Sequence, residues 1–129
     1  MYDLIIVGLG PAGVSAAIYA QRSNLKVLCI EKNNVGGLLN NIDTISNYPG
    51  CENIKGPDLS FNMFQQLQAM NIEIAFDTVT NIVKKDDFVI STTSKQYVTK
   101  RVILAIGRTA RKLGLKNEDR FLGKGLSFC

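Results

Sequence analysis

Apolar runs alternate with a helix-like segment in the first thirty residues of the chain. Residues 4–7, LIIV, are apolar without interruption and end at a glycine, which predicts a buried strand. Residues 11–23 combine helix-forming and small residues and end in polar ones, which predicts a helix packed closely on a flat surface. A second apolar run at 26–30 predicts another buried strand. Together they predict a βαβ unit with parallel strands and a right-handed crossover.

The middle of the chain is less regular. Residues 31–56 are rich in Asn and Gly and are interrupted by Pro49, so we expect a long loop, and long loops in compact domains are usually functional. A helix is predicted from Pro57 to residue 70, because apolar residues recur there on one helical face. These apolar positions are Leu59, Met63, Leu67 and Met70.

Strand-like patterns dominate from residue 72 onward. Residues 72–76 predict a strand, and three β-prone runs at 77–85, 87–94 and 95–99 are separated by turn residues, which predicts an antiparallel meander. Residues 101–107, RVILAIG, return to the pattern of a buried strand. The last twenty-two residues show no clear period.

The amino-acid composition limits the kinds of protein and of chemistry that this chain can represent. The 129 residues suit one domain, and 46% apolar with 20% charged residues is ordinary for a globular protein. No apolar run approaches the roughly eighteen residues that span a membrane, and the first residues lack the basic stretch of a signal peptide. We therefore expect a cytoplasmic protein that is not bound to a membrane. The chain has no His, which excludes Ser-His-Asp hydrolysis and His-ligated zinc, and its three cysteines form no metal-binding pattern.

Charge is unevenly distributed. Residues 100–129 hold eight of the fifteen Lys and Arg residues and two of the eleven acidic residues, a net charge of +6, whereas residues 1–99 carry −2. A basic tail can indicate a nucleic-acid partner. Aromatic residues do not interleave with these charges as a base-stacking surface requires, so we expect a solvated connection and no nucleic-acid binding.

The glycine motif Gly8, Gly10 and Gly13 in VGLGPAG is the strongest signal of chemistry. It follows a predicted strand and opens a predicted helix, the context that a Rossmann-like dinucleotide site requires. Gly8 allows the tight turn, Gly10 lets a pyrophosphate approach the backbone, and Gly13 lets the helix pack on the strand. Glu31, eighteen residues beyond Gly13, can accept hydrogen bonds from a ribose, and it would repel a 2′-phosphate, which disfavours NADP at this site.

The motif alone does not separate FAD from NAD. The meander before residue 101 favours FAD, and so does a resemblance. The sequence resembles the FAD-binding portion of the thioredoxin reductase family, within the two-dinucleotide-domain flavoprotein disulfide reductases. The resemblance extends over nearly the whole chain, and its matching segments appear in the order of the family. They are VGLGPAG, Glu31, GGLL at 36–39, NYPG at 47–50, VILAIG at 102–107 and GKGLSFC at 123–129.

The resemblance implies a fold, a cofactor and a set of ligands. The fold is an α/β Rossmann-like FAD-binding domain, with a parallel sheet, a β-meander crossover and an incomplete C-terminal end. The residues implied to bind FAD are Gly8, Gly10, Pro11, Ala12, Gly13, Glu31, Lys32, Gly36, Gly37, Leu38, Asn47, Val79, Ala105, Ile106 and Gly107. Leu38 stands where the family usually has Gln, and Ile106 where it usually has Thr. Both departures remove a polar group near the cofactor.

The resemblance also gives Cys129 a role. In the family a segment like GKGLSFC continues as a Cys-x-x-Cys dithiol, so Cys129 would be the first, catalytic cysteine of a truncated pair. Residues 1–129 would be a partial FAD-binding domain, with 1–110 as the βαβ core plus meander and 111–129 as a connection toward an NADPH domain that the chain lacks. Cys29 is expected to be a buried apolar-like residue.

The implied activity belongs to the parent protein. It would pass electrons from NADPH through FAD to the dithiol and then to thioredoxin or a similar disulfide protein, as a homodimer, and the 129-residue chain alone would be inactive. Three alternatives stay open: a ferredoxin-dependent flavin thioredoxin reductase, a ferredoxin–NADP reductase of the same architecture, and a nucleotide-binding module without turnover.

Overall fold

A parallel sheet forms the centre of the molecule, which is described here from a computed structural model for residues 1–127. Its four strands are β1 (Leu4–Val7), β2 (Val27–Glu31), β3 (Glu73–Phe76) and β7 (Val102–Leu104), and their spatial order is β3-β2-β1-β7. All neighbouring pairs are parallel. The second sheet is an antiparallel meander of β4 (Val79–Lys84), β5 (Phe88–Thr92) and β6 (Gln96–Thr99). The predicted α/β architecture is therefore confirmed.

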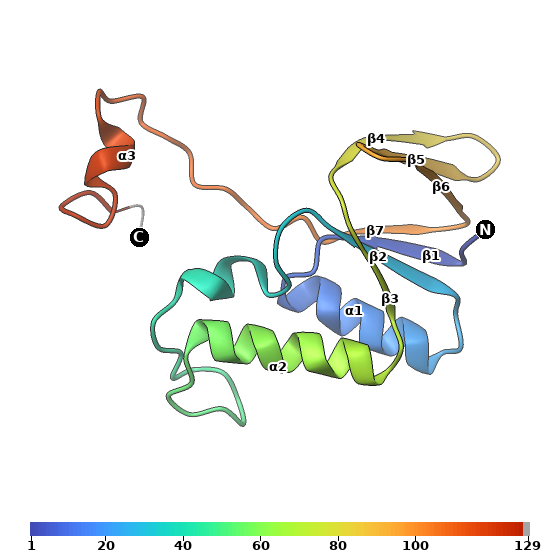
Figure 1. The fold of residues 1–129 in the computed structure, drawn as a ribbon, viewed down its shortest axis with the longest axis horizontal. Coiled ribbons are helices and arrows are strands. Elements are labelled where there is room, and N and C mark those ends of the chain that lie inside the picture. Colours follow the sequence, from blue (N-terminus) through green and yellow to red (C-terminus); the bar gives the residue numbers. More distant parts are fainter. Residues whose placement is uncertain (128–129) are drawn as a thin grey trace.

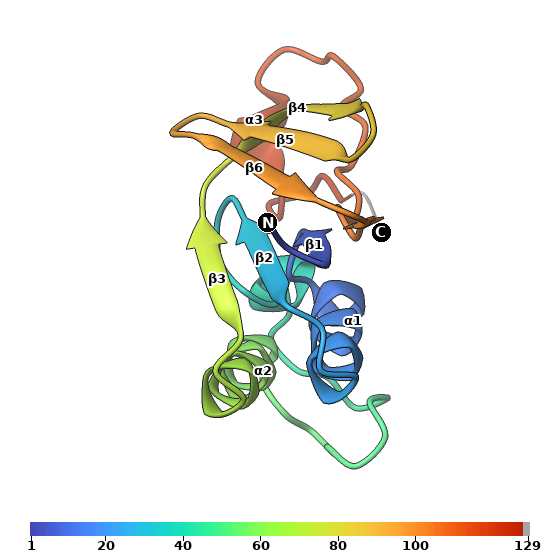
Figure 2. The ribbon, with the colours of Figure 1, turned by 90° about the vertical axis from the view of Figure 1, so that its right-hand side faces the viewer.

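The parallel sheet lies between the helices and the meander (Figures 1 and 2). Helices α1 (Pro11–Arg22) and α2 (Gly56–Ala69) lie side by side on one face, and the meander covers the other. Because successive side chains of a strand point to opposite faces, Leu4 and Ile6 pack in the core that includes both helices, whereas Ile5 and Val7 pack against the meander. Both faces are buried, which explains why β1 and β2 read as continuous apolar runs.

The two helices follow their sequence patterns. Proline stands in the first turn of each, where its missing N–H costs nothing. In α1 the buried residues include Gly13, Ala17 and Ala20, and these small side chains bring the helix close to the sheet. In α2 the predicted apolar face is buried at Leu59, Met63 and Leu67.

Cys29 lies in β2 with no exposed surface, as predicted for a small apolar residue. Burial raises the pKa of its thiol to about 12. The thiol therefore stays neutral near pH 7 and unreactive in the folded chain, because the thiolate is the nucleophilic form.

Three sequence-based expectations need correction. The loop at 31–56 contains a 3₁₀ helix, η1 (Gly37–Asn41), and the final segment contains a short helix, α3 (Glu118–Phe121). The run at 101–107 forms a shorter strand than predicted, and it is not buried: Ile103 is 40% and Leu104 60% exposed. The physical reason is position, since β7 is an edge strand of the parallel sheet.

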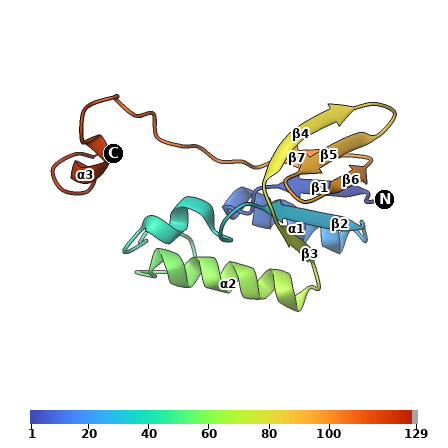
Figure 3. The ribbon, with the colours of Figure 1, turned by 45° about the horizontal axis from the view of Figure 1, so that its top comes forward.

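Beyond β7 the chain runs away from the sheet toward α3 (Figures 1 and 3). The carboxylate of Glu118 is buried and accepts hydrogen bonds from the backbone N–H groups of Leu113 and Gly114, at 2.8 and 2.9 Å. These bonds close a compact turn in front of α3. None of the helices in the described part of the chain has the length and apolar character needed to cross a bilayer.

Candidate functional site

The glycine turn joins β1 to α1 at the carboxyl end of the parallel sheet. Gly8 has a φ of +95°, a conformation that favours glycine, and its N–H donates to the carbonyl of Ile30 at 2.8 Å. A Cβ atom on Gly8 would lie 2.4 Å from the carbonyl oxygen of Ala105. A Cβ atom on Gly13 would lie 1.9 Å from the carbonyl oxygen of Gly8. These two glycines are therefore required by packing within the protein.

Gly10 differs from its two neighbours in the motif. A Cβ atom added there would have no protein atom within 4 Å apart from those of the adjoining residues, and Gly10 itself lines a large cavity. Its φ and ψ, −68° and −178°, are accessible to any residue. No contact inside the chain explains a glycine at this position, whereas a ligand approaching the backbone would. The turn thus has the shape expected of a cradle for phosphate groups.

The cavity has a volume of about 1000 Å³ and extends across the carboxyl ends of the parallel strands. Its lining includes eleven of the residues implied to bind FAD: Gly8, Gly10, Pro11, Glu31, Lys32, Gly37, Leu38, Val79, Ala105, Ile106 and Gly107. Sequence reasoning missed the polar residues Asn33, Asn34, Asn40, Asn41, Asp77, Thr78, Arg108 and Thr109, which also line it. Their residue types carry no motif, and only the fold brings them together.

Four of the candidate residues do not line this cavity. Gly13 is buried beneath the turn, and Ala12 is exposed in the first turn of α1. Gly36 is buried, and its N–H donates to the carbonyl of Leu9 at 2.7 Å, so it supports the glycine turn from behind. Asn47 is exposed in the loop before α2. Cys129 lies outside the described residues.

The paired glycines at 36 and 37 form a second tight turn beside the first. Gly36 has a φ of +100°, and a Cβ atom there would lie 2.0 Å from the hydroxyl oxygen of Ser60. The Nδ2 group of Asn40 donates to the carbonyls of Val35 and Gly37, at 3.0 and 3.1 Å. Asn40 therefore fixes the shape of this turn, a role that the GGLL string alone does not indicate.

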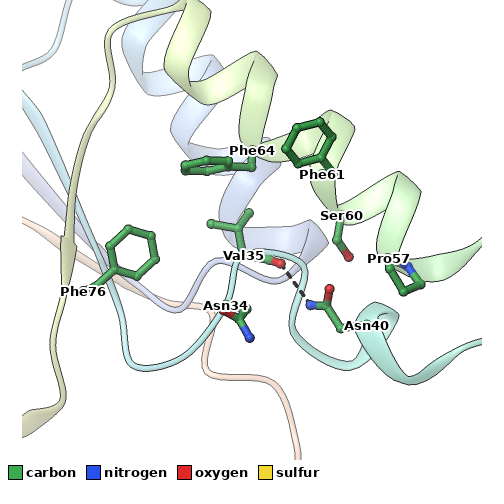
Figure 4. A pocket seen from close by; sticks show the side chains of 8 residues that line it. All are labelled: Asn34, Val35, Asn40, Pro57, Ser60, Phe61, Phe64 and Phe76. Atoms are coloured by element: carbon green, nitrogen blue, oxygen red, sulfur yellow. Dashed lines mark hydrogen bonds between the residues drawn. The ribbon is translucent and has the colours of Figure 1, made fainter.

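A smaller cavity of about 260 Å³ lies on the outer side of the same turn (Figure 4). Phe61 and Phe64 of α2 and Phe76 of β3 form its apolar walls, whereas Asn34 and Asn40 also line the large cavity. The hydroxyl of Ser60 is buried here and forms no hydrogen bond in the structure.

Glu31, at the end of β2, is 7% exposed. Its Oε2 accepts the N–H of Leu9 at 2.7 Å, and its Oε1 accepts the N–H of Asn33 at 2.8 Å. Each carboxylate oxygen has a second acceptor position, so Glu31 can still accept hydrogen bonds from a ligand. The ribose role implied for Glu31 is compatible with this geometry, but the contact with Leu9 was not foreseen.

Asp77 joins β3 to the meander at the other end of the cavity. Its carboxylate accepts hydrogen bonds from the hydroxyl of Thr93 and from the N–H groups of Thr78 and Ser94, the last two at 2.7 and 3.3 Å. The neighbouring hydroxyls of Thr92 and Thr93 hold the pKa of Asp77 well below its usual range.

This lowered pKa predicts an acid-dependent contribution of Asp77 to stability. A carboxyl whose pKa is lower in the folded than in the unfolded state stabilises the fold above its unfolded pKa of about 3.9 and loses that contribution as the pH falls below it. Asp77→Asn should therefore lower the melting temperature at pH 7, and the difference from wild type should shrink between pH 4 and pH 2. Thermal melts across this range test it, with the exposed Asp43→Asn as control. A difference that is constant with pH would contradict the prediction.

Basic groups accompany the phosphate cradle. Lys32 and Arg108 line the large cavity and are exposed, and the N-terminus of α1 points its free N–H groups toward ligands placed at the turn. The cradle, the helix N-terminus, the two cations and the carboxylate of Glu31 together fit a nucleotide with a pyrophosphate and a ribose. Within residues 1–127, no cluster of three or more His, Cys, Asp or Glu side chains could hold a metal ion.

Comparison with known proteins gives consistent matches. The model of the pyridine nucleotide-disulphide oxidoreductase family matches residues 2–129. The thioredoxin reductase of Treponema pallidum is 46% identical over 130 residues, covering 99% of this chain and 42% of that protein. The crystal structure of Lactococcus lactis thioredoxin reductase matches with a TM-score of 0.89 and 41% identity, covering 94% of this chain and 40% of that one.

A ferredoxin-flavin thioredoxin reductase from Clostridium acetobutylicum also matches, with a TM-score of 0.80 and 35% identity over 95% of this chain and 43% of that one. In all three cases the chain spans about two fifths of the length of the matching protein.

Proposed function

The chain belongs to the pyridine nucleotide-disulphide oxidoreductase family, and we propose from this premise that it binds FAD as part of a thioredoxin reductase-like oxidoreductase. The observation that carries the proposal is the environment of Gly10, where a side chain would point into the cavity and meet no protein atom. Such a position needs glycine only when a ligand comes close to the backbone.

Different residues of the chain would bind different parts of the cofactor. The N–H groups at the start of α1 would hold the pyrophosphate, and Glu31 would accept from the adenosine ribose. Val79 would contact the adenine edge through its backbone, and Leu38 and Ile106 would flank the flavin half. Both of these side chains are largely exposed at the cavity, 52% and 71%, so they can be covered by a bound ring.

Bound FAD would accept hydride from NADPH and pass electrons to a dithiol that contains Cys129, and then to thioredoxin. The protein supplies binding and orientation. We assign residues 1–110 to FAD binding and residues 111–129 to the connection toward Cys129. Homodimer formation and a cytoplasmic location belong to the same proposal, by similarity to the thioredoxin reductases.

Differential scanning fluorimetry with FAD, ADP and NAD tests the cofactor. A ligand that binds only the folded chain and is present at about 100 times its Kd adds about 2.7 kcal/mol to stability, which corresponds to roughly 5–15 °C for a domain of this size. We expect FAD to raise the melting temperature most, ADP less, and NAD least. Stabilisation by NAD without stabilisation by FAD would contradict the FAD assignment.

A ferredoxin-dependent reductase is the second candidate, supported by the match to the Clostridium acetobutylicum enzyme. The FAD site would serve either reductase, so the two candidates differ in the electron donor. Anaerobic addition of NADPH or of reduced ferredoxin to the complete FAD-loaded reductase of which this chain would be part, followed by flavin absorbance, separates them. Bleaching by reduced ferredoxin and not by NADPH would favour the second candidate.

A further inference from the structure

Leu9, the middle residue of the glycine turn, is held from two sides. Its N–H donates to the carboxylate of Glu31 at 2.7 Å, and its C=O accepts the N–H of Gly36 at 2.7 Å. Its side chain has no exposed surface. The N–H of Leu9 therefore faces into the protein and is not among the donors that a phosphate could use.

Glu31 anchors the glycine turn to the end of β2. The two oxygens of its carboxylate accept from residues on separate segments, Leu9 in the glycine turn and Asn33 just after the strand. Both hydrogen bonds are formed within the chain. A ribose would use only the remaining acceptor positions of the same carboxylate.

We propose that Glu31 is a positioning residue for the phosphate-binding turn, in addition to its implied contact with the ribose. By holding the Leu9 amide, it fixes the path of the backbone that leads into Gly10. Because the same carboxylate would accept hydrogen bonds from the ribose, it would also couple the ribose end of the ligand to the pyrophosphate end. The choice of ligand rests on the proposed function, whereas the contact with Leu9 does not.

Glu31→Gln is the informative substitution. A glutamine side chain has one acceptor oxygen and one NH₂ donor, so it can satisfy only one of the two N–H groups that meet Glu31. A hydrogen bond to a charged group is worth about tenfold to hundredfold in an equilibrium constant. The matched control is Glu52→Gln, which makes the same chemical change at an exposed position away from the cavity.

Amide hydrogen exchange on the ligand-free chain, followed residue by residue by NMR, tests the contact directly. In Glu31→Gln we expect the combined protection of the Leu9 and Asn33 amides to fall by about tenfold or more. The amides of Ile5 and Ile72, which donate to the carbonyls of Arg101 and Leu67 away from the glycine turn, should stay as in wild type, and so should all four amides in the Glu52→Gln variant. Unchanged protection of both Leu9 and Asn33 would overturn the proposal. A general loss of structure would raise exchange at all four amides, and Glu31→Asp, which keeps the charge but shortens the reach, would then be measured in its place.

Nucleotide binding by calorimetry separates positioning from ribose contact. The probes are ADP and 2′,3′-dideoxy-ADP, which keeps the pyrophosphate but lacks the ribose hydroxyls. We expect Glu31→Gln to weaken the binding of dideoxy-ADP by about tenfold and the binding of ADP by more. Equal affinity of wild type and Glu31→Gln for dideoxy-ADP would mean that Glu31 contributes to binding only through the ribose hydroxyls, and it would overturn the positioning role. If wild type bound neither nucleotide while Leu9 exchange still depended on Glu31, the proposed function would fail and the positioning role would stand.

Discussion

Replacing Gly13 by alanine is expected to destabilise the fold by about 3 kcal/mol, the upper end of the usual cost of overpacking a core. The added Cβ atom would lie 1.9 Å from the carbonyl oxygen of Gly8, a backbone atom that cannot move without shifting the turn. A glycine inside a helix normally gains about 0.5–1 kcal/mol when it becomes alanine. The free-energy cost of the clash therefore has to exceed the gain in helix stability that alanine brings, and we expect that it does.

Urea denaturation of Gly13→Ala against wild type measures this change. Typical domains have only about 5–15 kcal/mol of stability, so a loss of this size would shift the midpoint clearly. Gly10→Ala serves as the matched control, because the same substitution three residues earlier meets no protein atom within 4 Å. A Gly13→Ala variant as stable as wild type would show that α1 does not pack on the turn as the structure describes.

The parts of the fold that follow from local pattern could be predicted from the sequence. The uninterrupted apolar runs of β1 and β2 reflect burial on both faces, and the glycine turn between β1 and α1 carries a spacing with a known physical reason. The meander was predicted from its turn residues. In each case the information lies within a few residues of the element that it specifies.

The features that were missed depend on segments that are distant in sequence. Ile103 and Leu104 read as buried because the pattern of a strand does not state whether the strand lies at the edge of a sheet. The bond from Leu9 to Glu31 spans 22 residues, and the bond from Thr93 to Asp77 spans 16. The 3₁₀ helix at Gly37–Asn41 lies against α2, which comes later in the chain. Such contacts depend on segments that only the complete fold brings together.

The residues of the candidate site also fall into those that local sequence predicted and those that it missed. The glycines and Glu31 were predicted because each follows from the chemistry of a phosphate or a ribose. The polar lining at Asn40 and Asp77 was not predicted, since the side chains of these residues act mainly on the backbone of neighbouring turns. They shape the cavity by holding loops in place, and a side chain with that task leaves no periodic signal.

Gly10→Ala is expected to abolish most nucleotide binding and leave the fold intact. The backbone at Gly10 has φ and ψ values that alanine adopts freely, and no protein atom lies within 4 Å of the new methyl group. Stability should therefore be unchanged or slightly higher, by up to about 1 kcal/mol, because alanine restricts the unfolded chain. The methyl group would instead occupy the cavity at the point where the pyrophosphate must approach the turn.

Calorimetric titration with FAD and with ADP measures this loss, which we expect to be at least a hundredfold in Kd, about 2.7 kcal/mol. Far-UV circular dichroism and the melting temperature without ligand serve as controls for folding. The two glycines then give opposite results: Gly13→Ala loses stability because its side chain meets protein, and Gly10→Ala loses binding because its side chain meets the ligand. If Gly10→Ala bound both nucleotides as tightly as wild type, the phosphates would have to lie elsewhere, and the assignment of this cavity to a dinucleotide would fail even though the fold is that of the family.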